Sequence, residues 1–101
     1  MWLFAMFDLP VDTPAARRSY TRFRTSLLSE GFLMLQYSVY ARYFASDEAS
    51  AAKRKRIKEM LPPHGEVRLM AVTDHQFGKM EVFHGKKSSG PEAPPEQMAF
   101  F

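Results

Sequence analysis

The chain has 101 residues, which is enough for one small domain, and the absence of cysteine excludes disulfides and thiolate metal sites and suits a reducing cytoplasm. No apolar run approaches the roughly 20 residues of a membrane span, and the opening run is too short and lacks the basic leader of a signal peptide. The formal net charge is only +3, but residues 13–60 contain ten of the 14 Lys and Arg and four of the 11 Asp and Glu, so this segment carries +6. Such a basic segment favours a polyanionic partner such as nucleic acid, and a solvated basic surface is the common alternative.

The chain opens with an apolar run, Trp2 to Phe7, that ends at the carboxylate of Asp8. A short apolar run of this kind predicts a buried strand. Chemistry is often placed at strand ends, where rigid backbone gives way to loop. Asp8 is therefore a candidate catalytic or metal-binding residue; the alternative is that it only caps the turn into Pro10.

A first helix is predicted to begin at Thr13, a good N-cap, with Pro14 at the first helical position and Gly31 at its end. Its apolar residues recur at spacings of three and four on one stripe: Ala16, Tyr20, Phe23 and Leu27. The arginines avoid this stripe and occupy its flanks.

Residues 32–44 are rich in aromatic and β-branched side chains and are too long for an ordinary strand. We expect strands over 32–36 and 38–44, joined by a tight turn near Tyr37 and Ser38. One long bent strand is the alternative interpretation. The tyrosines of this segment could stack on bases, but packing in the core or a dimer interface is the favoured role. They are Tyr37, Tyr40 and Tyr43.

A second helix is predicted from Ser46 to Met60, with a thin apolar face of Ala49, Ala52, Ile57 and Met60. Its other side is strongly basic over residues 53–58, and a solvated helix face is slightly favoured there over DNA contact. Residues 66–73 then alternate as a strand, 73–77 form a single helical turn, and 80–84 form a short fifth strand.

A change in composition near the C-terminus divides the chain into three parts. They are a domain over 1–85, a Pro/Gly/Ser-rich flexible linker over 86–95 and an interface segment over 96–101. An apolar tip after a flexible tether usually docks on a partner, for example as a strand added to a sheet edge. The expected contact residues are Met98, Phe100 and Phe101.

The order strand–helix–strand–strand–helix–strand is the split βαβ or ferredoxin-like pattern, an α+β fold. It predicts a four-stranded antiparallel sheet with both helices on one face. A fifth strand and the C-terminal segment would then exchange or pack across a homodimer that covers the other face.

Three segments resemble the CRISPR-associated protein 2 family, in particular members from systems with a single large effector nuclease. They are Phe7-Asp8-Leu9-Pro10, the helix end Leu27-Leu28-Ser29-Glu30-Gly31-Phe32, and Gln36-Tyr37-Ser38-Val39-Tyr40. The resemblance covers residues 3–84.

The resemblance implies a homodimer that bridges dimers of the integrase, CRISPR-associated protein 1, and holds the double-stranded DNA to be inserted. Some family members are described as metal-dependent endonucleases on RNA or DNA. Asp8 matches the family's metal-associated aspartate, and Arg17 and Arg18 match its phosphate-contacting positions; Arg22 is added here because it shares a helix flank with Arg18.

One carboxylate per chain makes a poor magnesium site, so Mg²⁺ would have to be shared between the two Asp8 of a dimer. The histidines, His64, His75 and His84, are expected in surface or packing roles, and no good general base is apparent. The first hypothesis is therefore a DNA-binding scaffold for spacer acquisition. The alternatives are a magnesium-dependent endonuclease on single-stranded RNA or double-stranded DNA, and a toxin-type ribonuclease on the same fold.

Overall fold

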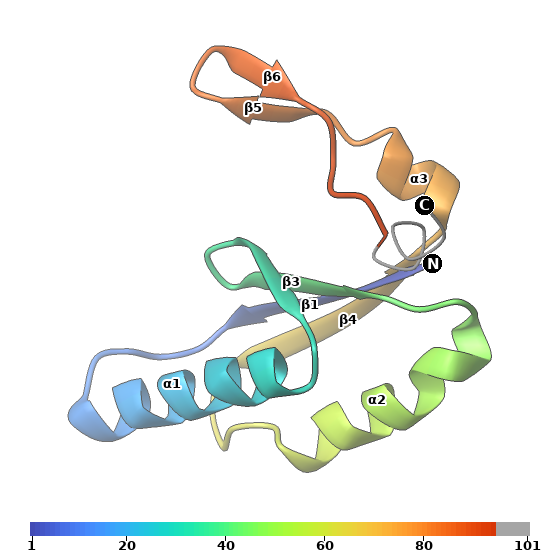
Figure 1. The fold of residues 1–101 in the computed structure, drawn as a ribbon. Helices are drawn as coiled ribbons and strands as arrows, with labels where there is room; N and C mark the ends of the chain where they lie inside the picture. Colours follow the sequence, from blue (N-terminus) through green and yellow to red (C-terminus); the bar gives the residue numbers. More distant parts are fainter. Residues whose placement is uncertain (95–101) are drawn as a thin grey trace.

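A computed structural model of the protein, which describes residues 1–94, contains a four-stranded antiparallel sheet in the order β2-β3-β1-β4. Helices α1 and α2 lie on one face of this sheet (Figure 1). The predicted α+β class and the ferredoxin-like order are thus confirmed. The elements are β1 (Trp2–Asp8), α1 (Pro14–Ser29), β2 (Leu33–Gln36), β3 (Val39–Tyr43), α2 (Asp47–Glu59), β4 (Glu66–Val72), α3 (Asp74–Gly78), β5 (Val82–His84) and β6 (Lys87–Ser89).

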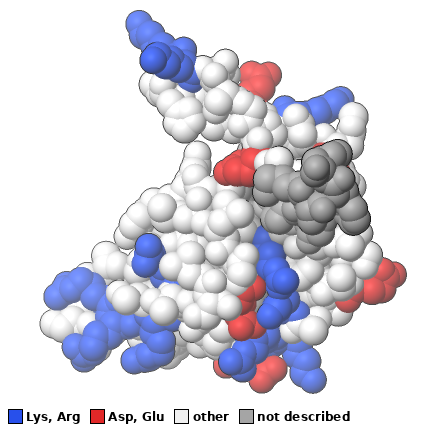
Figure 2. All heavy atoms as spheres, in the orientation of Figure 1, with Lys and Arg blue, Asp and Glu red and all other residues white. Residues whose placement is uncertain are grey.

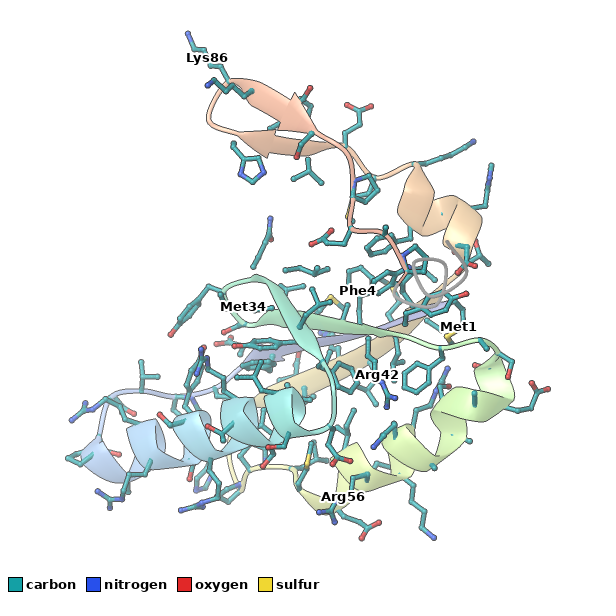
Figure 3. The ribbon with its side chains drawn as sticks, viewed as in Figure 1. Met1, Phe4, Met34, Arg42, Arg56 and Lys86 are labelled. Carbon is teal, nitrogen blue, oxygen red and sulfur yellow. The ribbon has the colours of Figure 1, made fainter. Side chains whose placement is uncertain are left out.

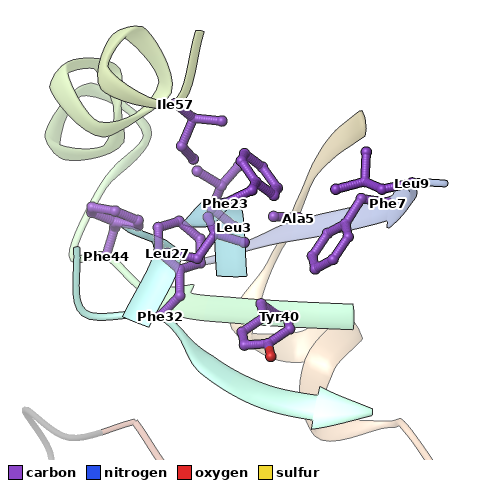
Figure 4. Packing of buried hydrophobic residues seen from close by; sticks show 10 residues of the cluster. All are labelled: Leu3, Ala5, Phe7, Leu9, Phe23, Leu27, Phe32, Tyr40, Phe44 and Ile57. Carbon is purple, nitrogen blue, oxygen red and sulfur yellow. The ribbon is translucent and has the colours of Figure 1, made fainter. Parts of the chain in front are cut away.

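Strand β1 is central, because it pairs with β3 on one side and with β4 along its whole length on the other. Side chains alternate between the two faces of a strand. Leu3, Ala5 and Phe7 are buried in the cluster that contains residues of α1 and α2 (Figure 4). The even-numbered residues of β1, including Asp8, therefore face the other side of the sheet, which we call the open face.

The same alternation continues into β3. Arg42, opposite Leu3, points to the side of the helices, whereas Phe4 on β1 points to the open face (Figure 3). The guanidinium of Arg42 lies 4.6 Å from the centre of the Phe44 ring, a cation–π contact that lets a charged residue sit beside the core.

Helix α1 forms as its sequence predicts. The Thr13 hydroxyl accepts a hydrogen bond from the Ala16 amide at 3.0 Å, which satisfies an amide at the helix start. Phe23 and Leu27 are buried, and Tyr20 packs against the same cluster.

Helix α2 meets the core with only part of the predicted apolar face: Ile57 is buried and Met60 packs against the core cluster, as predicted, but the two alanines do not. Ser50 and Ile57 are buried, whereas Ala49 and Ala52 are exposed. The Ser50 hydroxyl donates to the Asp47 carbonyl at 2.7 Å and accepts from Arg54 Nε at 3.0 Å, so its burial leaves no polar atom unsatisfied. The apolar pattern failed only at the two alanines, because alanine gains little from burial, while this serine is fully hydrogen-bonded.

Part of the basic run on α2 is neutralised within the fold. Glu30, the residue that ends α1, accepts a hydrogen bond from Lys53 at 3.2 Å and lies 3.8 Å from Arg56. Arg54 pairs with Asp47 at 2.6 Å. These pairs tie the end of α1 to α2 and leave Lys55 and Lys58 as exposed charges on this helix.

Helix α3 covers one end of the open face. Its Thr73 N-cap forms a capping box with Gln76, and the Phe77 ring stacks on Trp2 with centroids 4.2 Å apart and planes 10° apart. Both rings are nearly inaccessible to solvent. The helical turn predicted over 73–77 is confirmed, and it places the following chain above the sheet (Figure 1).

The structure differs from the sequence prediction at the start of the linker. Lys87–Ser89 forms strand β6, which pairs with the predicted fifth strand, β5, in a separate two-stranded sheet. The turn uses Gly85 at φ 65°. Because all three residues of β6 are polar and exposed, no hydrophobic alternation marked them as a strand. Met98, Phe100 and Phe101, and with them the predicted interface segment, lie outside the described residues.

Candidate acidic site and arginine cluster

The turn between β2 and β3 is fixed against the end of β1. Ser38 has a left-handed backbone, φ 63°, and its carbonyl accepts a hydrogen bond from the Phe7 amide at 3.1 Å. Its hydroxyl lies 3.0 Å from the Tyr20 hydroxyl on α1. A strained residue of this kind persists only where its surroundings hold it in place, and here the anchored turn stands beside Asp8.

Asp8 is exposed at the end of β1, on the open face. It lines a surface hollow of about 290 Å³ together with Tyr37, Ser38 and Arg68. Within residues 1–94 the Asp8 side chain makes no hydrogen bond or ion pair. Its carboxylate is therefore available to a ligand rather than engaged in capping the turn into Pro10.

A second carboxylate lies directly across the sheet. Glu66 on β4 is the register partner of Asp8 and lines the same hollow. The Arg68 guanidinium donates a hydrogen bond to it at 2.6 Å, and this bond and the positive charge hold the pKa of Glu66 below its usual value. Glu66 is thus ionised at neutral pH and already has a cationic partner, whereas Asp8 has none in the described chain.

One chain offers a magnesium ion a sparse donor set, since Arg68 already engages Glu66 and leaves Asp8 as the carboxylate without a cationic partner in this hollow. Mg²⁺ prefers near-octahedral oxygen coordination and commonly takes one or two carboxylates with water and phosphate oxygens. Among residues 1–94, no three His, Cys, Asp or Glu side chains gather where they could hold a metal ion. Asp12 and His64 line a different hollow, beside Pro62 and Pro63.

The predicted arginines do come together. Arg17, Arg18 and Arg22 line one open depression on α1 with Pro14 and Thr21. Arg17 donates to the Val11 carbonyl at 3.1 Å, and Arg18 and Arg22 are exposed. Figure 2 shows Lys and Arg side chains gathered over α1. This arginine cluster and the hollow at Asp8 are lined by different residues and form two separate sites.

The structure adds residues that the sequence did not single out. Glu66 and Arg68 could have been found from the even spacing of β4, but only once its register against β1 was known. Tyr37 was expected to pack, yet 75% of its surface is exposed. Tyr40 is fully buried, and Tyr43 contacts Trp2 edge-on.

Fold and site together define a class: a small ferredoxin-like domain with an acidic strand end on its open face and an arginine cluster on its first helix. A family model described as CRISPR associated protein Cas2 matches residues 1–80, and the chain belongs to this family. Within residues 1–94, no helix has the length and apolar character needed to cross a membrane.

Several curated proteins named CRISPR-associated endoribonuclease Cas2 are similar to this chain. The protein from Parvibaculum lavamentivorans is 50% identical over 101 residues, all of both chains. That from Flavobacterium psychrophilum is 43% identical over all of this chain and 88% of its own. The protein from Streptococcus mutans serotype c strain UA159 is 37% identical over 99% of this chain and 92% of its own.

The position of Asp8 depends on a glycine in the facing loop. Gly65 has φ 93°, and a Cβ there would lie 2.7 Å from the Asp8 carbonyl oxygen and 3.0 Å from Leu9 Cα. Gly85 is a matched control, because it also has a positive φ but its Cβ would meet open space. We expect Gly65→Ala to lower the free energy of unfolding by at least about 1 kcal/mol more than Gly85→Ala does.

Chemical denaturation of both variants measures this difference. Equal losses of stability would mean that backbone conformation alone, and not the close approach to Asp8, sets the requirement for glycine at position 65.

Proposed function

We propose that this protein acts in CRISPR adaptation, as a homodimer that binds double-stranded DNA and bridges dimers of the integrase. The observation that carries the proposal is the arginine cluster, in which three exposed guanidinium groups share one depression on α1. Membership of the Cas2 family supplies the CRISPR context.

The cluster suits the nucleic-acid backbone rather than base edges. Guanidinium groups bind phosphates as forked donors, and such contacts position a duplex without reading its sequence. Arg17 lies in the first turn of α1, where the partial positive charge of the helix start adds to its own, and Arg18 and Arg22 follow along the helix. The opposing surface of a duplex is uniformly anionic, so binding would be strong at low salt.

The open face supports the homodimer. An apolar hollow of about 130 Å³ is lined by Phe4, Leu35, Val39, Met80 and Val82, among others. Met70 on β4, the register partner of Phe4, is 46% exposed and adds further apolar surface. A second copy of the chain would cover this surface by two-fold symmetry, and the segment with Met98, Phe100 and Phe101 would join that interface.

A magnesium-dependent endonuclease on single-stranded RNA or double-stranded DNA is the second candidate, favoured by the available carboxylate of Asp8 beside Ser38 and Arg68. The two Asp8 side chains of a dimer would hold the ion between them. Bound there, Mg²⁺ would polarise a phosphate or supply hydroxide. Arg68 would orient the phosphate. The name endoribonuclease, carried by the similar proteins, agrees with this activity.

Replacing the arginine cluster should reduce the salt dependence of duplex binding. The slope of log K against log salt is negative, and each phosphate that the protein no longer neutralises reduces its magnitude by about 0.9. Arg17→Gln, Arg18→Gln and Arg22→Gln together should therefore weaken binding and flatten the slope. Titration of a fluorescent duplex at several salt concentrations measures it. Lys55→Gln with Lys58→Gln on α2 is the control; an unchanged slope in the arginine variant, or an equal change in the control, contradicts the proposal.

Replacing Asp8 separates the two candidate functions. With Asp8→Ala, a scaffold still supports integration of a labelled duplex by the integrase, whereas a nuclease loses its magnesium-dependent cleavage of RNA or DNA. Asp12→Ala, a carboxylate in the neighbouring loop, is the matched control. Loss of integration while the dimer is retained would count against the scaffold; cleavage that survives both chelation and Asp8→Ala would exclude this metal site.

A further inference from the structure

Among residues 1–94, Tyr37 is the aromatic residue with the largest exposed fraction. It lies at the tip of the turn between β2 and β3 with 75% of its surface accessible, whereas Tyr40 in the next strand is fully buried. It lines the hollow that contains Asp8 and Arg68. An exposed ring beside a strand-end carboxylate and a guanidinium group is placed where a ligand would meet all three.

The Tyr37 ring has an aromatic neighbour on α1. It stacks on Tyr20 of α1, with ring centroids 5.8 Å apart and planes 20° apart. Tyr20 is itself fixed, because its hydroxyl lies 3.0 Å from the Ser38 hydroxyl and its ring meets Phe7 edge-on at 5.8 Å. At this centroid distance the two rings are offset, so Tyr20 contacts only part of one face of the Tyr37 ring, and 75% of the side chain stays accessible to solvent.

A partly ordered ring lowers the cost of binding a second planar group. The contact with Tyr20 restricts the Tyr37 side chain in part, so a base that stacks on the exposed face of the ring has less side-chain entropy left to remove. Base–aromatic stacking tolerates any base, because each has a π-face. Within a closed duplex both faces of every internal base are already covered, so only an unpaired or terminal base can use this site.

Arg68 provides a partner for the adjoining phosphate. Arg68 pairs with Glu66, and the exposed fractions of the two side chains are 70% and 63%. Exposed ion pairs of this kind are weak. The guanidinium can therefore turn from Glu66 to a phosphate at little cost, and a phosphate accepts its donors in the same forked manner.

We propose that Tyr37, stacked on Tyr20, is a base-binding platform that gives the hollow at Asp8 a site for one unpaired nucleotide, with Arg68 on its phosphate. This inference rests on the proposed nucleic-acid binding and adds to it a site separate from the arginine cluster. The arginine cluster holds the backbone of a duplex, and Tyr37 receives a base that is not paired.

Three substitutions separate stacking from other roles of the ring. Tyr37→Phe keeps the ring, Tyr37→Leu keeps the apolar bulk without it, and Tyr37→Ala removes both. The full chain is titrated with a short single-stranded oligonucleotide, as DNA and as RNA, that carries the fluorescent base 2-aminopurine. A dumbbell duplex with closed ends, which offers no terminal base, is the second probe.

We expect Tyr37→Ala and Tyr37→Leu to weaken binding of the single strand roughly 5- to 150-fold, and Tyr37→Phe to change it less than about twofold. Binding of the dumbbell should stay within about twofold in every variant. Quenching of 2-aminopurine by stacking should appear with the wild type and with Tyr37→Phe only.

Several results would overturn the inference. Full binding by Tyr37→Leu would reduce the ring to an apolar contact, and an equal loss of affinity for the dumbbell would make it a general DNA contact. Conversion of a dimer to a monomer by Tyr37→Ala in light scattering would assign the ring to an interface between copies. A wild type that binds the dumbbell but not the single strand refutes only this inference, and one that binds neither refutes the proposed function as well.

Discussion

The alternation of side chains along β1 is the constraint on which the rest of the structure depends. Since β1 is paired on both sides, its odd-numbered residues pack beneath α1 and α2, and Trp2 packs against α3 on the open face. A slip of one residue would turn Asp8 towards the helices and bring Phe7 out of the core. The burial of apolar side chains on two faces thus fixes a carboxylate that itself contributes nothing to packing.

The end of the sheet at Asp8 is rigid because separate segments meet there through short contacts. The turn at Ser38 is bonded to the backbone of β1 and to Tyr20 of α1, and Gly65 packs against the carbonyl of Asp8. Rigid surroundings of this kind hold functional groups in place without cost at the moment of binding. They also leave two distinct surfaces, the arginine cluster on α1 and the hollow on the open face.

Much of the fold could be predicted from the sequence because its signals were local. Thr13, the stripe through Phe23 and Leu27, and the helical turn that begins at Thr73 act within a few residues, and all lie where expected. Ser50 on α2 and strand β6 could not be predicted, since their environments depend on hydrogen bonds that no apolar pattern records. At the candidate site, Asp8 was proposed from its position at a strand end, and Arg17 and Arg18 from the family resemblance. Glu66, Arg68 and the exposure of Tyr37 required the register of β4 and the shape of the turn.

In the proposed dimer, two copies of the chain meet on the open face and bring their Asp8 residues together, and cross-linking tests this arrangement most directly. The chain has no cysteine, so Asp8→Cys carries a single thiol and can be treated with a short bismaleimide cross-linker. Glu59→Cys, at the exposed end of α2 on the other side of the sheet, is the control. We expect Asp8→Cys to form a covalent dimer rapidly while Glu59→Cys stays monomeric on denaturing gels. A covalent dimer from Glu59→Cys alone, or none from either, would contradict this arrangement.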